Sequence, residues 1–135
     1  MFAPSMKTLT LSALALCLAA AVVIAPVRLA AAPEDNARGR ELFAQCMACH
    51  KIDRSGVSGI GPNLYKVVGR RAGSLARFSY SPAMKAYGQT WNEALLDAYL
   101  AAPARAVPGN RMPYAGMRSP DDRKAVIAYL VSASR

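Results

Sequence analysis

"CMACHKI", residues Cys46 to Ile52, sets two cysteines three positions apart and a histidine directly behind the second. The chain of 135 residues has three cysteines and one histidine, so this stretch holds most of them. Four explanations need comparison: a disulfide, a structural zinc site, a thioredoxin-like redox pair and a covalently attached haem.

Three of these explanations account poorly for the stretch. A structural zinc site takes four ligands, and apart from Cys17 near the N-terminus the chain offers only three cysteine and histidine ligands. A redox pair is expected in a βαβ setting, and the surrounding sequence lacks the alternating apolar pattern of strands. A plain disulfide leaves the adjacent histidine unexplained.

The order Cys-x-x-Cys-His is the attachment signature of c-type haem. In this chemistry the two thiols bond to the porphyrin, and the histidine that follows is placed to ligate the iron. We therefore expect one haem c per chain, attached through Cys46 and Cys49, with His50 as an iron ligand.

The first 32 residues have the layout of a secretory signal peptide. Their only charged residues are Lys7 and Arg28; the stretch 9–25 is apolar, and three alanines occupy positions 30–32. A basic residue, an apolar run and small residues before a cut are typical of exported proteins. We predict a signal peptide at residues 1–32, cleaved within the alanine run.

The exported part would be one domain at residues 33–135, located in the periplasm. An uncleaved anchor in the inner membrane, with the domain facing the periplasm, is the alternative, since about 17 apolar residues approach the length that spans a bilayer. Pro26, close before the alanines, favours cleavage. Of 17 Lys and Arg residues two lie in the segment, which leaves 15 against 8 acidic residues and a net charge of +7.

Helix signals recur through the domain, and no alternating apolar run is long enough for a sheet. A first helix is expected at 34–48, a short one from Ser81 to Gly88, one from a capping box at Thr90 to Pro103, and one from Ser119 to Ser134. Irregular stretches at 53–79 and 102–120 separate them. The sequence predicts a small all-α domain of about four helices, whose long loops need a group to wrap around.

The second axial ligand of the iron is the next question. There is no second histidine, and methionine is the remaining common choice; its thioether raises the reduction potential. The domain has four methionines: Met47, Met84, Met112 and Met117. Met47 lies inside the attachment motif, and Met84 and Met117 are interpreted as packing residues. Met112 leads, because Pro108 and Pro113 stiffen the loop that carries it.

Six segments follow one another in a recognisable order: CMACHK, GIGPNLYKVVGRRAG, FSYSPAM, TWNEALLDAYL, VPGNRMPYAG and DDRKAVIAYL. With them the chain resembles the class I cytochrome c family, in the branch of bacterial cytochromes c2 and mitochondrial cytochromes c. The resemblance covers nearly all of residues 34–133. It implies the cytochrome c fold, a helical domain wrapped around one covalent haem c.

The resemblance also implies roles for single residues. His50 and Met112 match the two axial ligands, and Pro62 matches the proline whose carbonyl accepts a hydrogen bond from the proximal imidazole. Positions around the haem propionates are matched by Arg70, Tyr80 and Trp91, and Tyr99 matches a tyrosine near the methionine sulfur.

Four positions depart from the family pattern. Met84 stands where many relatives have asparagine, Asn110 and Arg111 replace the usual threonine and lysine, and Tyr114 replaces phenylalanine. We expect these changes to leave iron ligation intact and to affect the potential and the docking surface.

The resemblance implies an electron carrier, not an enzyme: a soluble monomeric cytochrome whose iron cycles between Fe(II) and Fe(III). Its partners would be acidic docking surfaces on membrane redox complexes, with a cytochrome bc1-type quinol:cytochrome c oxidoreductase as donor and a terminal oxidase or photosynthetic reaction centre as acceptor. Six basic residues could surround the haem edge: Lys51, Lys66, Arg70, Arg71, Arg111 and Arg118. Nucleic acid is not expected as a partner, and contact with the membrane would be transient unless residues 9–25 are retained.

A haem enzyme or gas sensor is the second hypothesis. It would need an open iron or a distal base, and no second histidine is present to act as one.

Overall fold

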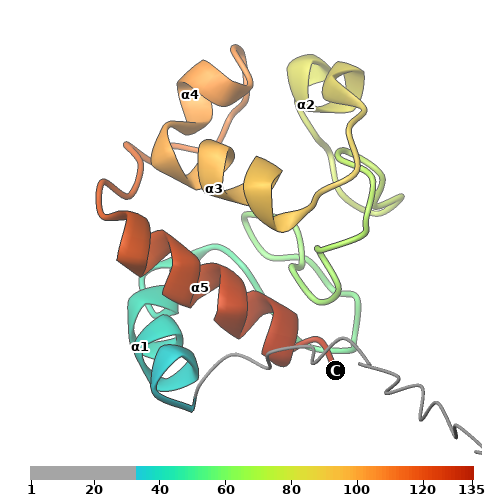
Figure 1. The fold of residues 1–135 in the computed structure, drawn as a ribbon. Helices are drawn as coiled ribbons and strands as arrows, with labels where there is room; N and C mark the ends of the chain where they lie inside the picture. The colour runs from blue at the N-terminus through green and yellow to red at the C-terminus, as the bar shows by residue number, and fades with distance from the viewer. Residues whose placement is uncertain (1–32) are drawn as a thin grey trace, which may run out of the picture.

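The computed structural model describes residues 33–135, so the predicted signal peptide at residues 1–32 lies outside the described residues. The elements are α1 (Pro33–Phe43), the 3-10 turn η1 (Cys46–Ala48), α2 (Pro82–Tyr87), α3 (Glu93–Ala101), α4 (Pro103–Ala106) and α5 (Pro120–Ser132). Between residues 33 and 135 the backbone forms no strand, only an isolated bridge between Arg71 and Thr90. The all-α prediction is confirmed (Figure 1). No helix in this range is long and apolar enough to cross a membrane.

Two helices begin at the side-chain caps that the sequence predicted, and one ends at the predicted glycine. Ser81 accepts a hydrogen bond from the backbone N–H of Met84 at 3.1 Å, and Ser119 accepts one from Asp122 at 3.2 Å. Gly88 ends α2 in the left-handed conformation, with φ of 63°. These starts and this stop are confirmed.

Two other boundaries were predicted wrongly. The first helix ends at Phe43, and the attachment motif begins a separate 3-10 turn instead of continuing that helix to residue 48. The N-cap of α3 is Asn92, whose side chain accepts from the Leu95 N–H at 2.8 Å. Thr90 lies in the bridge to Arg71 instead.

The helix α4 lies in a stretch that was predicted to be irregular. Pro103 ends α3, as expected, but the same residue occupies the first position of α4. Proline has no N–H to donate and a φ preset near the helical value, so it suits the first turn of a helix as well as it stops the preceding one. Ala102, with φ of −159°, separates the two helices.

Helix α5 lies against α1 and also contacts α3 (Figure 1). Phe43 of α1 and Val126 of α5 are each 1% exposed, and the rings of Phe43 and Tyr129 lie 5.2 Å apart. Gly39 is buried at this contact, where an added Cβ atom would meet the Ala125 carbonyl oxygen at 2.1 Å. The close packing of the two helices therefore requires glycine at this position.

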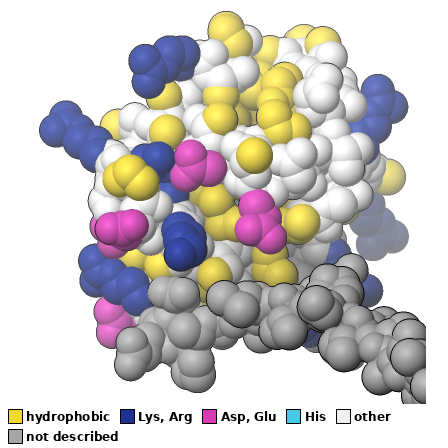
Figure 2. Space-filling view, in the orientation of Figure 1, with side chains coloured by type: hydrophobic (Ala, Val, Ile, Leu, Met, Phe, Trp, Pro, Cys, Tyr) yellow, Lys and Arg dark blue, Asp and Glu magenta, His cyan; other side chains and the backbone are white. Residues whose placement is uncertain are grey.

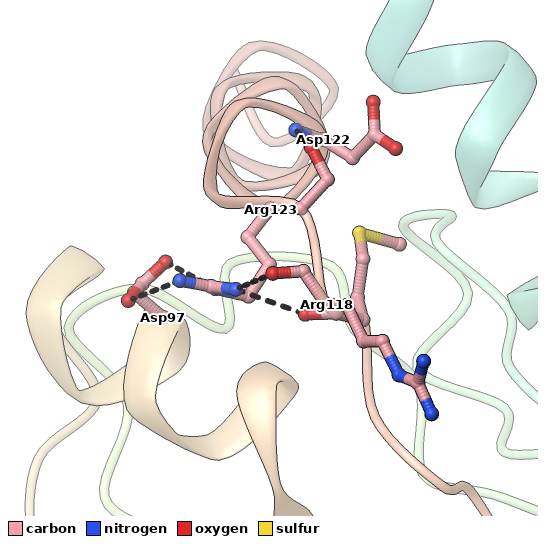
Figure 3. Close-up of polar contacts among 6 residues, drawn as sticks. Asp97, Arg118, Asp122 and Arg123 are labelled. Carbon is pink, nitrogen blue, oxygen red and sulfur yellow. Dashed lines mark hydrogen bonds and ion pairs between the residues drawn. The ribbon is translucent and has the colours of Figure 1, made fainter.

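Arg123 of α5 joins three parts of the chain (Figure 3). Its Nε donates to Asp97 of α3 at 2.7 Å, and its Nη1 donates to the backbone carbonyls of Met117 and Arg118, both at 2.9 Å. The side chain is 11% exposed. Arg123 thereby fixes the end of the long loop that follows α4 to both α3 and α5.

Replacing Arg123 by lysine is expected to lower the free energy of unfolding by about 1–2 kcal/mol, because an ammonium group cannot serve a carboxylate and two carbonyls from a planar fork. Urea unfolding of the haem-loaded protein, followed by circular dichroism, measures the change. Lys124→Arg, an exposed neighbour, is the control and should change stability by less than about 0.5 kcal/mol. Equal urea midpoints of unfolding for Arg123→Lys and Lys124→Arg would show that the hydrogen bonds of Arg123 add nothing to stability.

Candidate haem site

A cavity of about 490 Å³ opens among the loops and helices. Its walls are mostly apolar, and six of the side chains that line it also belong to the hydrophobic core: Val67, Met84, Trp91, Leu96, Tyr99 and Leu130. The attachment motif forms one part of the wall and the loop with Met112 another. All nine residues that the sequence predicted for the site line this cavity: Cys46, Cys49, His50, Pro62, Arg70, Tyr80, Trp91, Tyr99 and Met112.

The thiols of Cys46 and Cys49 are free and half-buried. The backbone turns tightly here, because the N–H groups of Cys49 and His50 both donate to the Cys46 carbonyl, at 3.1 and 2.9 Å. Burial, and next the neighbouring Cys49, raises the pKa of the Cys46 thiol. The turn thus holds two thiols and the imidazole on the wall of one cavity. Cys46 and Cys49 form no disulfide with each other in the structure.

The imidazole of His50 is prepared for binding a metal. Its Nδ1 lies 2.7 Å from the Pro62 carbonyl oxygen, which can only accept, so Nδ1 carries the proton. Burial lowers the pKa of His50, although the hydrogen bond to Pro62 acts in the opposite direction. The ring is therefore neutral, with the lone pair on Nε2, and the Pro62 hydrogen bond fixes its orientation.

Gly61 completes this wall. A Cβ atom built at Gly61 would lie 2.5–2.8 Å from three atoms of the His50 ring. Only glycine lets the loop backbone pass so close to the imidazole. Gly61 was not among the residues predicted for the site, although its place directly before Pro62 was the available clue.

Arg70 supplies a half-buried positive charge at the cavity. Its guanidinium donates to the carbonyls of Asn63 at 2.8 Å and Tyr65 at 3.1 Å. Among the described side chains no carboxylate lies within ion-pair distance of it. Burial lowers the pKa of Arg70, and Tyr80 beside it acts in the opposite direction. A half-buried cation held by neutral carbonyls is suited to carboxylate groups on a bound ligand, such as those of haem.

Met84 and Met112 line the cavity, whereas Met47 is 63% exposed and Met117 is packed in the core. Met84 is fixed inside the short helix α2, but Met112 lies in a loop.

The Tyr99 hydroxyl donates to Asn110 Oδ1 at 3.4 Å, and burial raises the pKa of Tyr99 to about 12. Tyr99 therefore remains protonated and able to donate at neutral pH.

Of the six basic residues expected at the haem edge, Arg70, Arg71 and Arg111 line the cavity, while Lys51, Lys66 and Arg118 do not. The ammonium of Lys66 lies 5.7 Å from the centre of the Tyr65 ring. On the face shown in Figure 2, Lys and Arg side chains project separately and form no single patch.

Taken together, these residues fit a haem: two free thiols, a neutral imidazole with its second nitrogen available, a thioether, apolar walls and a half-buried cation that has no carboxylate partner among residues 33–135. The fold and the site define a small helical haem-binding domain.

Comparison with known proteins agrees with this assignment. The family model "Cytochrome c" matches residues 36–134. Cytochrome c2 of Rhodomicrobium vannielii is 45% identical over 98 residues, which cover 73% of this chain and 78% of that protein. Cytochrome c2 iso-2 of Magnetospirillum fulvum is 48% identical over 90 residues, 67% of this chain and 93% of that protein. Among solved structures, cytochrome cH from Methylobacterium extorquens has a TM-score of 0.68 and 39% identity, covering 73% of this chain and 98% of that chain.

The chain belongs to the cytochrome c family. The resemblance predicted from the sequence motifs is confirmed, and with it the covalent haem c attached through Cys46 and Cys49.

Proposed function

We propose that this protein is a soluble, periplasmic, one-electron carrier whose haem iron has His50 and Met112 as axial ligands. One observation carries the proposal: both side chains line the same cavity, and the imidazole of His50 is held neutral with Nε2 free. Bound haem supplies the iron that alternates between Fe(II) and Fe(III). His50 and Met112 would hold the iron from the protein, so that an electron could enter and leave without exchange of ligands.

The surroundings support a carrier with low reorganisation. With haem bound, the apolar walls would keep water from much of the site, and His50 is fixed by Pro62 and Gly61. Arg70, Tyr80 and Trp91 would hold the haem propionates, and Tyr99 would lie near the Met112 sulfur. Relatives named cytochrome c2 favour this role over that of a haem enzyme.

The basic domain is suited to acidic docking surfaces on membrane complexes. We propose a cytochrome bc1-type complex as electron donor and a terminal oxidase or photosynthetic reaction centre as acceptor. Arg71 and Arg111, both exposed and at the cavity, are the first residues expected to contact such partners. The carrier would act as a monomer.

The test of the proposed ligands compares Met112→Leu with Met84→Leu. Both changes keep the apolar volume and remove a sulfur that lines the cavity. The purified ferric wild type should show the weak red charge-transfer band of methionine sulfur on iron, and its reduced form should not bind carbon monoxide. We expect Met112→Leu to lose the band completely and to bind carbon monoxide, and Met84→Leu to retain wild-type behaviour in both assays.

Each other outcome has a definite meaning. Loss of the band in Met84→Leu, with retention in Met112→Leu, would make Met84 the ligand. Absence of the band from the wild type, with ready binding of carbon monoxide, would indicate an open iron. The enzyme or gas-sensor hypothesis would then replace that of the carrier.

A further inference from the structure

Asn110 lies two residues before Met112 and uses all four hydrogen-bonding positions of its side-chain amide. Its Nδ2 donates to the carbonyls of Pro103 at 2.9 Å and Val107 at 3.0 Å. Its Oδ1 accepts from the Met112 N–H at 2.8 Å and from the Tyr99 hydroxyl at 3.4 Å. One side chain thus joins the Met112 backbone to three other positions.

The partners of Asn110 belong to the rigid part of the molecule. Pro103 is the first residue of α4 and Val107 is its C-cap, and both are buried. Tyr99 belongs to α3 and is also buried. Asn110 therefore connects the loop at residues 108–113, which carries Met112, to two helices at once.

The loop itself has little other support. Its residues Pro108, Gly109, Arg111 and Pro113 are exposed, and only Asn110 and Met112 turn part of their side chains away from solvent. Backbone hydrogen bonds at the loop are short-range, from Asn110 to Val107 and from Tyr114 to Met112. The Met112 N–H has the Asn110 side chain as its partner. The position of Met112 thus depends on the side-chain amide of Asn110.

We infer that Asn110 is a positioning residue that holds the Met112 loop against α4 and α3 and slows the release of Met112 from the haem iron. The inference rests on the proposed ligation by Met112. Alanine at this position would remove all four hydrogen bonds. Serine would keep an oxygen able to accept from an N–H two residues on, but could not donate to both α4 carbonyls.

The experiment measures how fast imidazole displaces Met112 in the ferric haem protein. At saturating imidazole, the rate at which the red methionine–iron band disappears approaches the rate at which the loop opens. We expect Asn110→Ala to raise this limiting rate at least about tenfold, as the loss of several hydrogen bonds of ordinary strength predicts, with Asn110→Ser in between. The presence of the red methionine–iron band in each variant, recorded before imidazole is added, shows whether Met112 still ligates the iron.

Asn92→Ala is the matched control, because it removes an asparagine side chain whose Oδ1 accepts from a backbone N–H at the same 2.8 Å distance, but at the start of α3. Its limiting rate should stay within about twofold of the wild type even where urea unfolding shows lower stability. An unchanged rate in Asn110→Ala would overturn the positioning role alone, and so would an equal acceleration in Asn92→Ala. A wild type without the band would overturn the proposed ligand and, with it, this role.

Discussion

A Cys46→Ala/Cys49→Ala double variant, which cannot attach haem, is expected to be largely unfolded at room temperature. Core residues such as Trp91, Leu96 and Leu130 line the cavity, so the haem completes the hydrophobic core rather than resting on its surface. A cavity of about 490 Å³, if fully enclosed and empty, would cost at most roughly 12 kcal/mol at about 24 cal/mol per Å³. That upper bound is comparable to the whole stability of a domain, about 5–15 kcal/mol.

Far-UV circular dichroism and hydrogen exchange of the double variant measure this outcome. Cys46→Ala alone is the control, because it removes a thiol but retains Cys49 and His50, so haem can still be attached by one bond. We expect the single variant to keep native helix content and slow amide exchange. A double variant with the same helix content and protection would contradict the view that the fold depends on haem.

The helical architecture was predictable because its signals are local. Ser81 and Ser119 cap helices through their own side chains, and Gly88 stops one by taking a positive φ, so each boundary depends on neighbours within a few residues. The error at the start of α3 arose where two local signals compete. Thr90 and Asn92 can both cap the start of α3. In the structure Thr90 is bridged to Arg71, which is distant in sequence, and Asn92 provides the cap.

The site was predictable for a different reason. Attachment chemistry fixes Cys46, Cys49 and His50 in one short motif, and the prolines around Met112 favoured it as the second ligand. The other contacts came from the family resemblance, since a lone arginine or tyrosine carries no signal of its own. All of these residues do line one cavity. The supporting roles of Gly61 and Asn110 were not predicted, because both residues act through contacts that appear only after folding. An added Cβ at Gly61 would lie 2.5 Å from the imidazole, and Asn110 donates to carbonyls of a helix that was not expected.

Gly39 also acts through a contact that appears only after folding. Its substitution is the second change for which we expect a large effect. From the sequence, this glycine only weakens the first helix. In an isolated helix, alanine in its place would be more stable by about 1 kcal/mol. In the folded protein the new Cβ would lie 2.1 Å from the Ala125 carbonyl oxygen and 2.8 Å from the Tyr129 Cβ, and a backbone atom of α5 cannot move aside alone. We therefore expect Gly39→Ala to lower the free energy of unfolding by at least about 3 kcal/mol.

Urea unfolding of the haem-loaded protein measures the effect of Gly39→Ala. The control is Gly56→Ala, where an added Cβ meets nothing within 4 Å and only the positive φ of 69° opposes the change, at a cost of about 1–2 kcal/mol. A larger loss at Gly39 than at Gly56 isolates the steric contact, because the helical preference for alanine acts in the opposite direction at Gly39. If Gly39→Ala left stability equal or higher, α1 and α5 would have to adjust their packing freely, and the close approach of the two helices would not be what holds α1 against α5.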